Sequence, residues 1–191
     1  MKSLIIFAHP NTCGHNLLIL KIIKEHINSN YEVLNLYEMN YNPVLKDEEH
    51  YTCGNNSISK ETKTIQDKIK KSDNLIFIYP IWWKSMPGIL KGFFDRTILS
   101  GFAFKYVDGT PIGLLDDKKA LVFMTGGGSE SYYKEDYDYP IKHISEDILG
   151  FCGIDTKVEV FGRCFNLDED KKEKIKVKVK KVLSNENLLK N

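Results

Sequence analysis

Residues 75–96 read LIFIYPIWWKSMPGILKGFFDR and predict a strand, a loop and the start of a helix. Residues 75–79 form an unbroken apolar run, which is typical of a strand buried on both faces of a parallel sheet. Pro80 cannot donate to a β-ladder, so we expect the strand to end there. Pro87 stands where a helix would begin, because the first helical turn tolerates a residue without an N–H.

The loop between the two prolines carries Trp82 and Trp83. It follows a buried strand, and open parallel sheets bind their ligands at the carboxyl ends of their strands. The two indoles therefore indicate a wall for a flat aromatic ligand. Core packing is the alternative, since tryptophans are mostly core or interface residues.

Composition limits the class of protein. The chain has 191 residues, of which 42% are hydrophobic and 28% charged. These values are ordinary for a soluble globular protein, and we expect a single domain over residues 1–191. Lys and Arg number 27 against 26 for Asp and Glu, so no long-range field favours nucleic acid or a membrane surface.

The cysteines indicate the compartment. Cys13, Cys53, Cys152 and Cys164 form no C-x-x-C pair and have no metal-ligand spacing with histidine. We therefore expect reduced thiols, no metal site and a cytoplasmic location. The apolar run at residues 4–8 is too short for a signal peptide or a bilayer span, so we expect no membrane insertion.

The rest of the chain alternates strands and helices. Further buried strands are predicted at residues 3–8, 31–36, 120–124 and 156–161. Helices are predicted at residues 15–28, 60–72, 87–99 and 140–149. This alternation predicts a doubly wound α/β domain, a five-stranded parallel sheet with helices on both faces. The polar residues 38–60 between the second strand and the next helix form a long loop, which is typical of a functional or mobile segment.

The C-terminal tail fits two patterns. Ile175, Val177 and Val179 alternate with lysines as in a strand, but apolar residues also recur at helical spacing. We favour a helix, because the acidic residues 168–170 precede the lysines and complement a helix N-terminus.

Three loops leave the carboxyl ends of predicted strands, and in the strand order 2-1-3-4-5 they line one crevice. The loop 9–16 leads into a helix, whose free N–H groups attract phosphate, although an ordinary strand–helix connection explains it too. The run Gly126-Gly127-Gly128 lets backbone amides approach a ligand closely, with a flexible turn as the alternative. A phosphate end, the aromatic wall and a ring of amides together describe a flavin nucleotide site.

Several of these residues resemble one family, the flavodoxin-like NAD(P)H:quinone oxidoreductases of the DT-diaphorase type. The resemblance runs from residue 3 to about residue 160 and rests on His9-Pro10, Asn16, PIWW at 80–83, PGILKGFFDR at 87–96, TGGGS at 125–129 and FCG at 151–153. It implies a flavodoxin-like fold, tightly held FAD or FMN, a homodimer, and two-electron transfer from NAD(P)H to quinones or similar flat acceptors.

The resemblance also implies roles by position. The flavin phosphates or ribityl chain would meet His9, His15 and Asn16. The isoalloxazine would be bordered by Pro80, Ile81, Trp82, Trp83 and Lys84, with Thr125, Gly126, Gly127 and Gly128 beneath its pyrimidine edge. Tyr133 would donate a hydrogen bond there as the catalytic tyrosine, and Phe104 and Tyr106 would close over the substrate of the other subunit.

The chain departs from the family at three places. Gly14 stands where many relatives have a hydroxyl residue, and Lys84 replaces an aromatic residue. The histidine that relatives pair with the tyrosine has no clear match, with Tyr139 near its place and His143 as a substitute. FAD against FMN, NADH against NADPH, and the natural acceptor stay open.

Two other functions are compatible with such a fold. Some relatives are ancillary regulatory flavoprotein subunits of potassium-efflux systems. An electron-carrying flavodoxin is disfavoured, because the hydroxyl-rich phosphate loop and strongly acidic surface of those proteins are absent. We therefore expect the enzyme.

Overall fold

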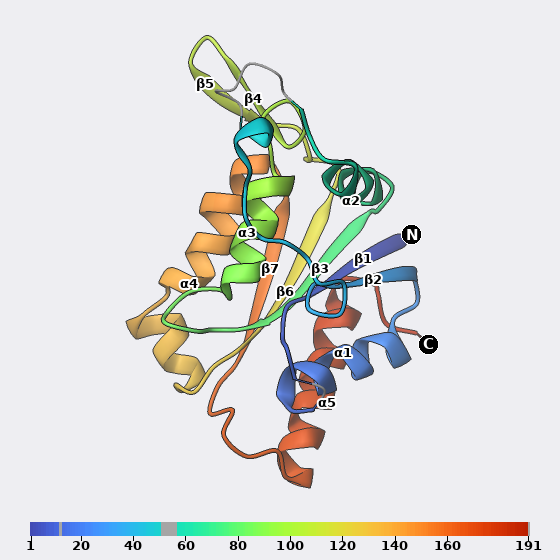
Figure 1. Ribbon diagram of the computed structural model, residues 1–191. Coiled ribbons are helices and arrows are strands. Elements are labelled where there is room, and N and C mark those ends of the chain that lie inside the picture. Colours follow the sequence, from blue (N-terminus) through green and yellow to red (C-terminus); the bar gives the residue numbers. More distant parts are fainter. Residues whose placement is uncertain (12, 51–56, 191) are drawn as a thin grey trace.

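A parallel sheet lies at the centre of the structure, a computed structural model that describes residues 1–11, 13–50 and 57–190. The sheet has five strands in the order β2-β1-β3-β6-β7, and every neighbouring pair is parallel (Figure 1). The strands are β1 (Lys2–Phe7), β2 (Asn30–Asn35), β3 (Asn74–Pro80), β6 (Lys119–Thr125) and β7 (Asp155–Phe161). The predicted doubly wound sheet and its strand order are confirmed.

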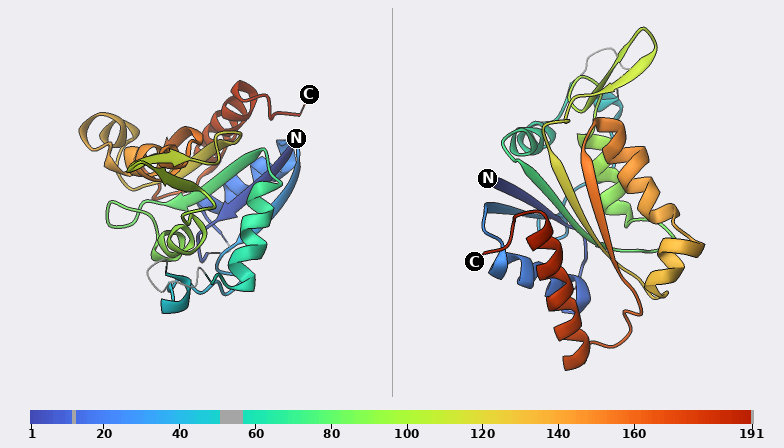
Figure 2. Two further views of the ribbon diagram at one scale, coloured as in Figure 1. Left: turned by 90° about the horizontal axis from the view of Figure 1, so that it is seen from above. Right: turned by 180° about the vertical axis from the view of Figure 1, so that it is seen from behind.

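Helices cover both faces of this sheet. On one face α1 (His15–His26) and α5 (Glu169–Asn185) lie side by side (Figure 2). The other face is covered by α2 (Lys60–Lys70), α3 (Gly88–Thr97) and the segment 139–152. That segment starts as α4 (Tyr139–Lys142), continues as a π-helix (His143–Leu149) and ends in a 3-10 turn (Gly150–Cys152).

Each face of the sheet has its own apolar core, because strand side chains alternate in direction. In β1, Ile5 and Phe7 contact the α1–α5 layer, whereas Leu4 and Ile6 contact the opposite layer. All seven residues of β3 are buried, as expected for a central strand covered on both sides.

The tail is helical, as predicted. Asp168 caps α5, and its carboxylate accepts a hydrogen bond of 2.8 Å from the Lys171 amide. Ile175, Val179 and Leu183 of α5 are buried on one face, while the lysines between them remain more exposed. The strand alternative for the tail is therefore wrong.

Among the described helices, none has the length and apolarity that a bilayer crossing requires.

A hairpin that was not predicted stands at the amino end of the sheet (Figure 1). It consists of β4 (Phe104–Val107) and β5 (Thr110–Gly113), which pair antiparallel. Asp108 and Gly109 have φ angles of 50° and 78°, the conformation of a two-residue type I′ turn. The segment that follows returns directly to the start of β6, so this hairpin is remote from the carboxyl edge of the sheet.

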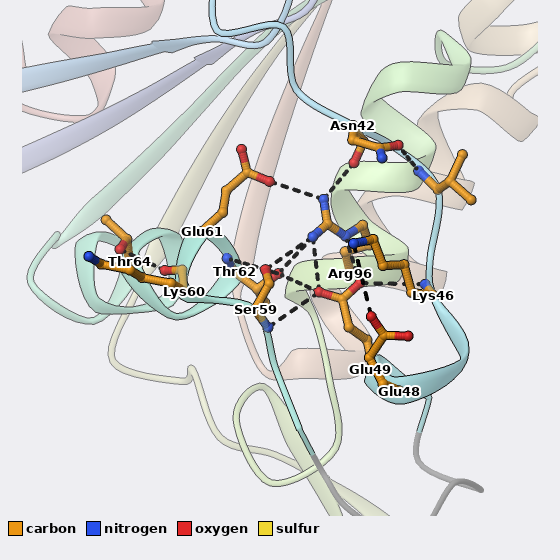
Figure 3. A network of polar contacts seen from close by, with 11 residues as sticks. Asn42, Lys46, Glu48, Glu49, Ser59, Lys60, Glu61, Thr62, Thr64 and Arg96 are labelled. Carbon is orange, nitrogen blue, oxygen red and sulfur yellow. Dashed lines mark hydrogen bonds and ion pairs between the residues drawn. The ribbon is translucent and has the colours of Figure 1, made fainter.

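The long loop after β2 is anchored by one arginine (Figure 3). Arg96 of α3 pairs with both carboxylate oxygens of Glu49, at 3.0 and 2.9 Å, and donates to the Asn42 carbonyl. Glu49 ends a short 3-10 helix (Asp47–Glu49), and both partners are almost fully buried.

Of the described thiols, Cys13, Cys152 and Cys164 are free, while Cys53 lies outside the described residues.

Candidate functional site

The loops after β1, β3 and β6 meet in a crevice of about 280 Å³ at the carboxyl edge of the sheet. The convergence that the strand order predicts is therefore present. The crevice is lined by His9, Asn11, Cys13, Gly14, His15, Asn16, Pro80, Ile81, Trp82, Thr125, Gly126, Gly127 and Cys164. Of the predicted flavin-binding residues, Trp83, Lys84 and Gly128 do not line it in this conformation.

The first wall of the crevice is the start of α1. Gly14 is the N-cap residue with φ 95°, and no side chain caps the helix. The first-turn amides therefore lack a side-chain acceptor, and with the helix dipole they favour an anionic group. A glycine suits this position because its φ lies in the left-handed region.

The side-chain amide of Asn16 is buried at the crevice, and one of its two polar atoms is unpaired within the described part of the chain. The residue is only 4% exposed, and its Nδ2 donates to Thr125 Oγ1 at 2.8 Å. Its Oδ1 is buried without a hydrogen-bond partner among the described residues. A buried acceptor left unpaired costs about 1–3 kcal/mol. A ligand hydroxyl or amide in the crevice would satisfy it, so the residues fit a polar ligand such as a ribityl chain.

Two histidines complete this wall. The Asn11 amide donates to His9 Nδ1 at 3.0 Å, and His15 Nε2 donates to the Asn166 carbonyl at 3.1 Å. Burial lowers the pKa of both imidazoles below the usual 6.5, and the positive charge of Lys171 further lowers the pKa of His15. Burial therefore favours the neutral form of both rings, which offers hydrogen bonds.

The tryptophan loop is a tight turn. Trp82 and Ser85 exchange two backbone hydrogen bonds of 2.9 Å, and Trp83 and Lys84 between them have φ angles of 49° and 61°. This is the type I′ pattern, which usually requires Asn or Gly, and it costs roughly 1–2 kcal/mol per side-chain-bearing residue. Strain of this kind clusters at functional sites.

The side chains of this turn face outward. Trp83 is fully exposed, and Trp82 is 40% exposed with its ring 5.8 Å from that of His9. The core-packing alternative for the tryptophans is therefore wrong. Lys84 reaches across to the segment after β6, where its Nζ lies 4.2 Å from the centre of the Tyr137 ring.

The glycine loop offers fewer free amides than its sequence suggests. The Gly126 amide donates to the Phe161 carbonyl at 2.9 Å, and the Gly128 amide donates to the Tyr133 hydroxyl at 3.2 Å. Only the Gly127 amide has no hydrogen-bond acceptor within the described part of the chain. The expected ring of amides is thus reduced to one donor.

Tyr133 lies directly behind this loop. It is buried, and a Cβ at Gly126 would approach its hydroxyl to 2.5 Å, which explains the glycine there. Because the hydroxyl accepts from Gly128, it keeps its own proton for a second hydrogen bond.

The remaining predicted residues lie elsewhere. Phe104 and Tyr106 belong to the hairpin at the amino end and do not reach the crevice of their own chain. His143 bonds to Asp147 at 3.2 Å and stacks on Tyr139, and neither of these rings lines the crevice. Neither stands beside Tyr133 as the family histidine would.

Four lining residues were not among the predicted site residues, namely Asn11, Cys13, Gly14 and Cys164. The strand-order rule could have found Cys164, because the loop after β7 leaves the same edge of the sheet next to the loop after β6.

The comparisons agree with this geometry. A family model described as a flavodoxin-like fold matches residues 1–185. A Haemophilus influenzae protein called an uncharacterized NAD(P)H oxidoreductase is 35% identical over 88% of this chain and 87% of its own length. NAD(P)H dehydrogenase (quinone) 1 of Rattus norvegicus is 30% identical over 80% of this chain and 65% of its own length, slightly less than two thirds.

A solved structure shows the same relation. The NAD(P)H:quinone oxidoreductase from Methanothermobacter marburgensis superposes with a TM-score of 0.80 at 26% identity, covering 95% of this chain and 96% of the other. The chain therefore belongs to the flavodoxin-like NAD(P)H:quinone oxidoreductase family.

Proposed function

We propose that this protein is a flavin-dependent NAD(P)H:quinone oxidoreductase. The observation that carries the proposal is the crevice itself, where an uncapped helix N-terminus, a buried unpaired amide oxygen and an exposed tryptophan turn meet at the carboxyl edge of the sheet. The quinone reductases among the relatives support this assignment.

The residues of the crevice divide by chemistry. The α1 amides, His9, His15 and Asn16 would hold the phosphate and the ribityl hydroxyls of FMN or FAD. Pro80 and the residues 81–84 would border the flat ring system. When bound, flavin supplies the two-electron chemistry that connects NAD(P)H with a quinone.

Two groups of the chain would stabilise negative charge at the edge of the bound ring. The Gly127 amide is unpaired, and the Tyr133 hydroxyl is held by Gly128 with its proton available. Donors fixed in place before reaction need no rearrangement, and loss of one such donor typically costs about 2.7–4 kcal/mol of activation free energy.

We further propose a homodimer in which Phe104 and Tyr106 close over the crevice of the partner protomer. Their hairpin stands at the opposite end of the sheet from the crevice of its own chain (Figure 1). Tyr106 is 60% exposed, and Val107 and Ile112 beside it are also exposed. An exposed aromatic and aliphatic hairpin is a surface suited to a protein interface.

The free thiols among the described residues support a cytoplasmic protein, and we assign residues 1–191 to a single domain. No observation within the described residues favours the regulatory role on a potassium-efflux system. The enzyme is therefore the only function that we propose.

Steady-state kinetics test this function. Flavin-loaded protein should oxidise NADH or NADPH only when a quinone such as 2-methyl-1,4-naphthoquinone is present, at a rate far above that of an equal amount of free flavin. Varying both substrates should give the parallel double-reciprocal lines of a ping-pong reaction. Fully loaded protein that shows no quinone-dependent oxidation with either nucleotide would refute the proposed function.

A further inference from the structure

Lys84 places a positive charge beside the crevice at a rigid position. It occupies the third position of the Trp82–Ser85 turn, whose ends are joined by two backbone hydrogen bonds. Its side chain extends toward Tyr137, and its Nζ lies 4.2 Å from the centre of that ring. The turn thus fixes the backbone of Lys84 close to Trp82, which lines the crevice.

The partner of Lys84 is an aromatic wall. Tyr137 stacks on Tyr132 with ring centres 6.0 Å apart, and Tyr132 contacts Tyr133 at 5.2 Å. The lysine therefore bridges two of the loops that form the site, the one after β3 and the one after β6. The ring face attracts the ammonium group weakly, which favours this position of Nζ without neutralising its charge.

The charge of Lys84 is not balanced by a carboxylate. Among the described residues, no Asp or Glu oxygen lies within 4 Å of its Nζ, whereas Lys91, Lys134 and Lys142 each form an ion pair. Burial lowers the pKa of the two crevice histidines, His9 and His15, and so favours their neutral forms. Lys84 is thus a positive charge without an ion pair among the described residues, and it follows the fully exposed Trp83 in the turn.

An indole face beside a cation recognises a flat ring that carries an anionic group. We propose that Lys84 determines substrate specificity by favouring flat aromatic acceptors with a sulfonate or carboxylate substituent over neutral acceptors of the same ring system. The proposal rests on the proposed quinone reductase function and names a substrate class for that site.

Two naphthoquinones test the proposal. The ratio of kcat/KM for 1,4-naphthoquinone-2-sulfonate to kcat/KM for 2-methyl-1,4-naphthoquinone is measured for the wild type, Lys84→Gln, Lys84→Arg and Lys84→Glu. In a ping-pong reaction kcat/KM for the acceptor does not depend on the NAD(P)H step, so effects on nucleotide binding do not enter the ratio. All variants keep a side chain at the left-handed position, so backbone strain is matched.

Loss of one exposed charge pair should lower the ratio about two- to fivefold in Lys84→Gln. Charge reversal in Lys84→Glu should lower it by roughly the square of that factor, and Lys84→Arg should restore it. The difference between wild type and Lys84→Gln should shrink at 0.5 M salt, because exposed charges are screened. Lys181→Gln, which removes an exposed lysine from the C-terminal half of α5, should leave the ratio unchanged.

The outcomes separate the two proposals. If the wild type turns over both quinones and the ratio is the same in Lys84→Gln and Lys84→Glu, then Lys84 does not select charge and the inference is wrong. A ratio that falls equally in Lys181→Gln also overturns it, since net charge alone would then explain the effect. Failure of the loaded wild type to reduce either quinone refutes the proposed function and this inference together.

Discussion

Asn16 has a buried side-chain acceptor that a bound ligand could pair. Its Oδ1 is buried and unpaired, while its Nδ2 is engaged by Thr125. Asn16→Leu removes the unpaired acceptor but also the hydrogen bond that Nδ2 donates to Thr125, so the stability of the flavin-free protein should fall by about 1 kcal/mol. Flavin affinity should fall by about 5- to 150-fold, which corresponds to 1–3 kcal/mol for one buried hydrogen bond.

Fluorescence titration with flavin and urea unfolding measure the two quantities. Asn74→Leu is the matched control, because Asn74 is also buried with an unpaired amide group but lies at the start of β3, at the other end of the sheet. Equal flavin affinity in Asn16→Leu and the wild type would show that this oxygen does not meet the flavin.

Trp83 offers a second test at the residue scale. Its side chain is fully exposed, so Trp83→Ala should change the free energy of unfolding by no more than about 0.5 kcal/mol. Turnover or flavin retention should nevertheless fall if the exposed indole borders the bound ring, as we propose. Unchanged turnover together with unchanged flavin retention would contradict this role of Trp83.

The sequence predicted the role of a residue where its type favours one local structure. It failed where contacts between residues distant in the sequence determine which hydrogen bonds form. The three glycines predicted a loop whose backbone amides can approach a ligand closely. However, the Gly126 amide donates to the Phe161 carbonyl and the Gly128 amide donates to the Tyr133 hydroxyl. Those contacts depend on how β7 and the tyrosine segment pack. The left-handed turn at Trp83 and Lys84 also has no sequence signal, because neither residue favours that conformation.

At the scale of elements, the buried ion pair of Arg96 and Glu49 joins α3 to the long loop (Figure 3). Hydrogen bonds from Arg96 lower the pKa of Glu49 from 4.5 to about 2. Because the folded-state pKa is depressed, the stabilisation is fully present above pH 4.5 and is lost as the pH falls toward 2. Glu49→Gln leaves the buried guanidinium with only the partly exposed Glu61, 3.1 Å away, as its counter-charge among the described residues and should cost up to about 3–5 kcal/mol at pH 7.

Urea unfolding of the wild type and Glu49→Gln at several pH values checks this prediction. The stability difference should shrink by about 1.4 kcal/mol between pH 7 and pH 3.5, the linkage expected for that pKa shift. Glu48→Gln, on the exposed side of the same turn, should behave like the wild type throughout. A difference for Glu49→Gln that does not change with pH would contradict the lowered pKa.

Elements with continuous apolar runs were predictable, because burial on both faces leaves a long sequence signal. The strands β1, β3 and β6 belong to this class. The edge strands β2 and β7 and the helical tail are only partly buried and were predicted from the spacing of their apolar residues. The hairpin β4–β5 was missed although Asp108-Gly109 is a strong turn signal. The anchor of the long loop joins residues distant in the sequence, and no periodicity marks such a contact.

At the scale of the whole molecule, the position of the hairpin leads to a prediction about subunits. Phe104 and Tyr106 cannot serve the crevice of their own chain from the amino end of the sheet, so they should serve the partner's. Gly127→Glu should prevent flavin binding and Tyr106→Gly should remove the lid. Mixing the two variants should restore roughly a quarter of wild-type activity, because random exchange makes half the dimers mixed, each with one intact site of two.

The experiment requires that each variant alone is inactive and dimeric and that subunit exchange is complete. Mass spectrometry of intact dimers, with one variant isotopically labelled, verifies the exchange. Complete exchange without recovered activity would place the lid in its own chain or remove it from the reaction.

Flavin binding by the purified protein tests the central claim most directly. After heat release, mass spectrometry and absorbance should find FMN or FAD at close to one per chain, and flavin-free protein should regain it on titration with one of the two. A colourless protein that binds neither FMN nor FAD would contradict the assignment of the crevice and, with it, the proposed function.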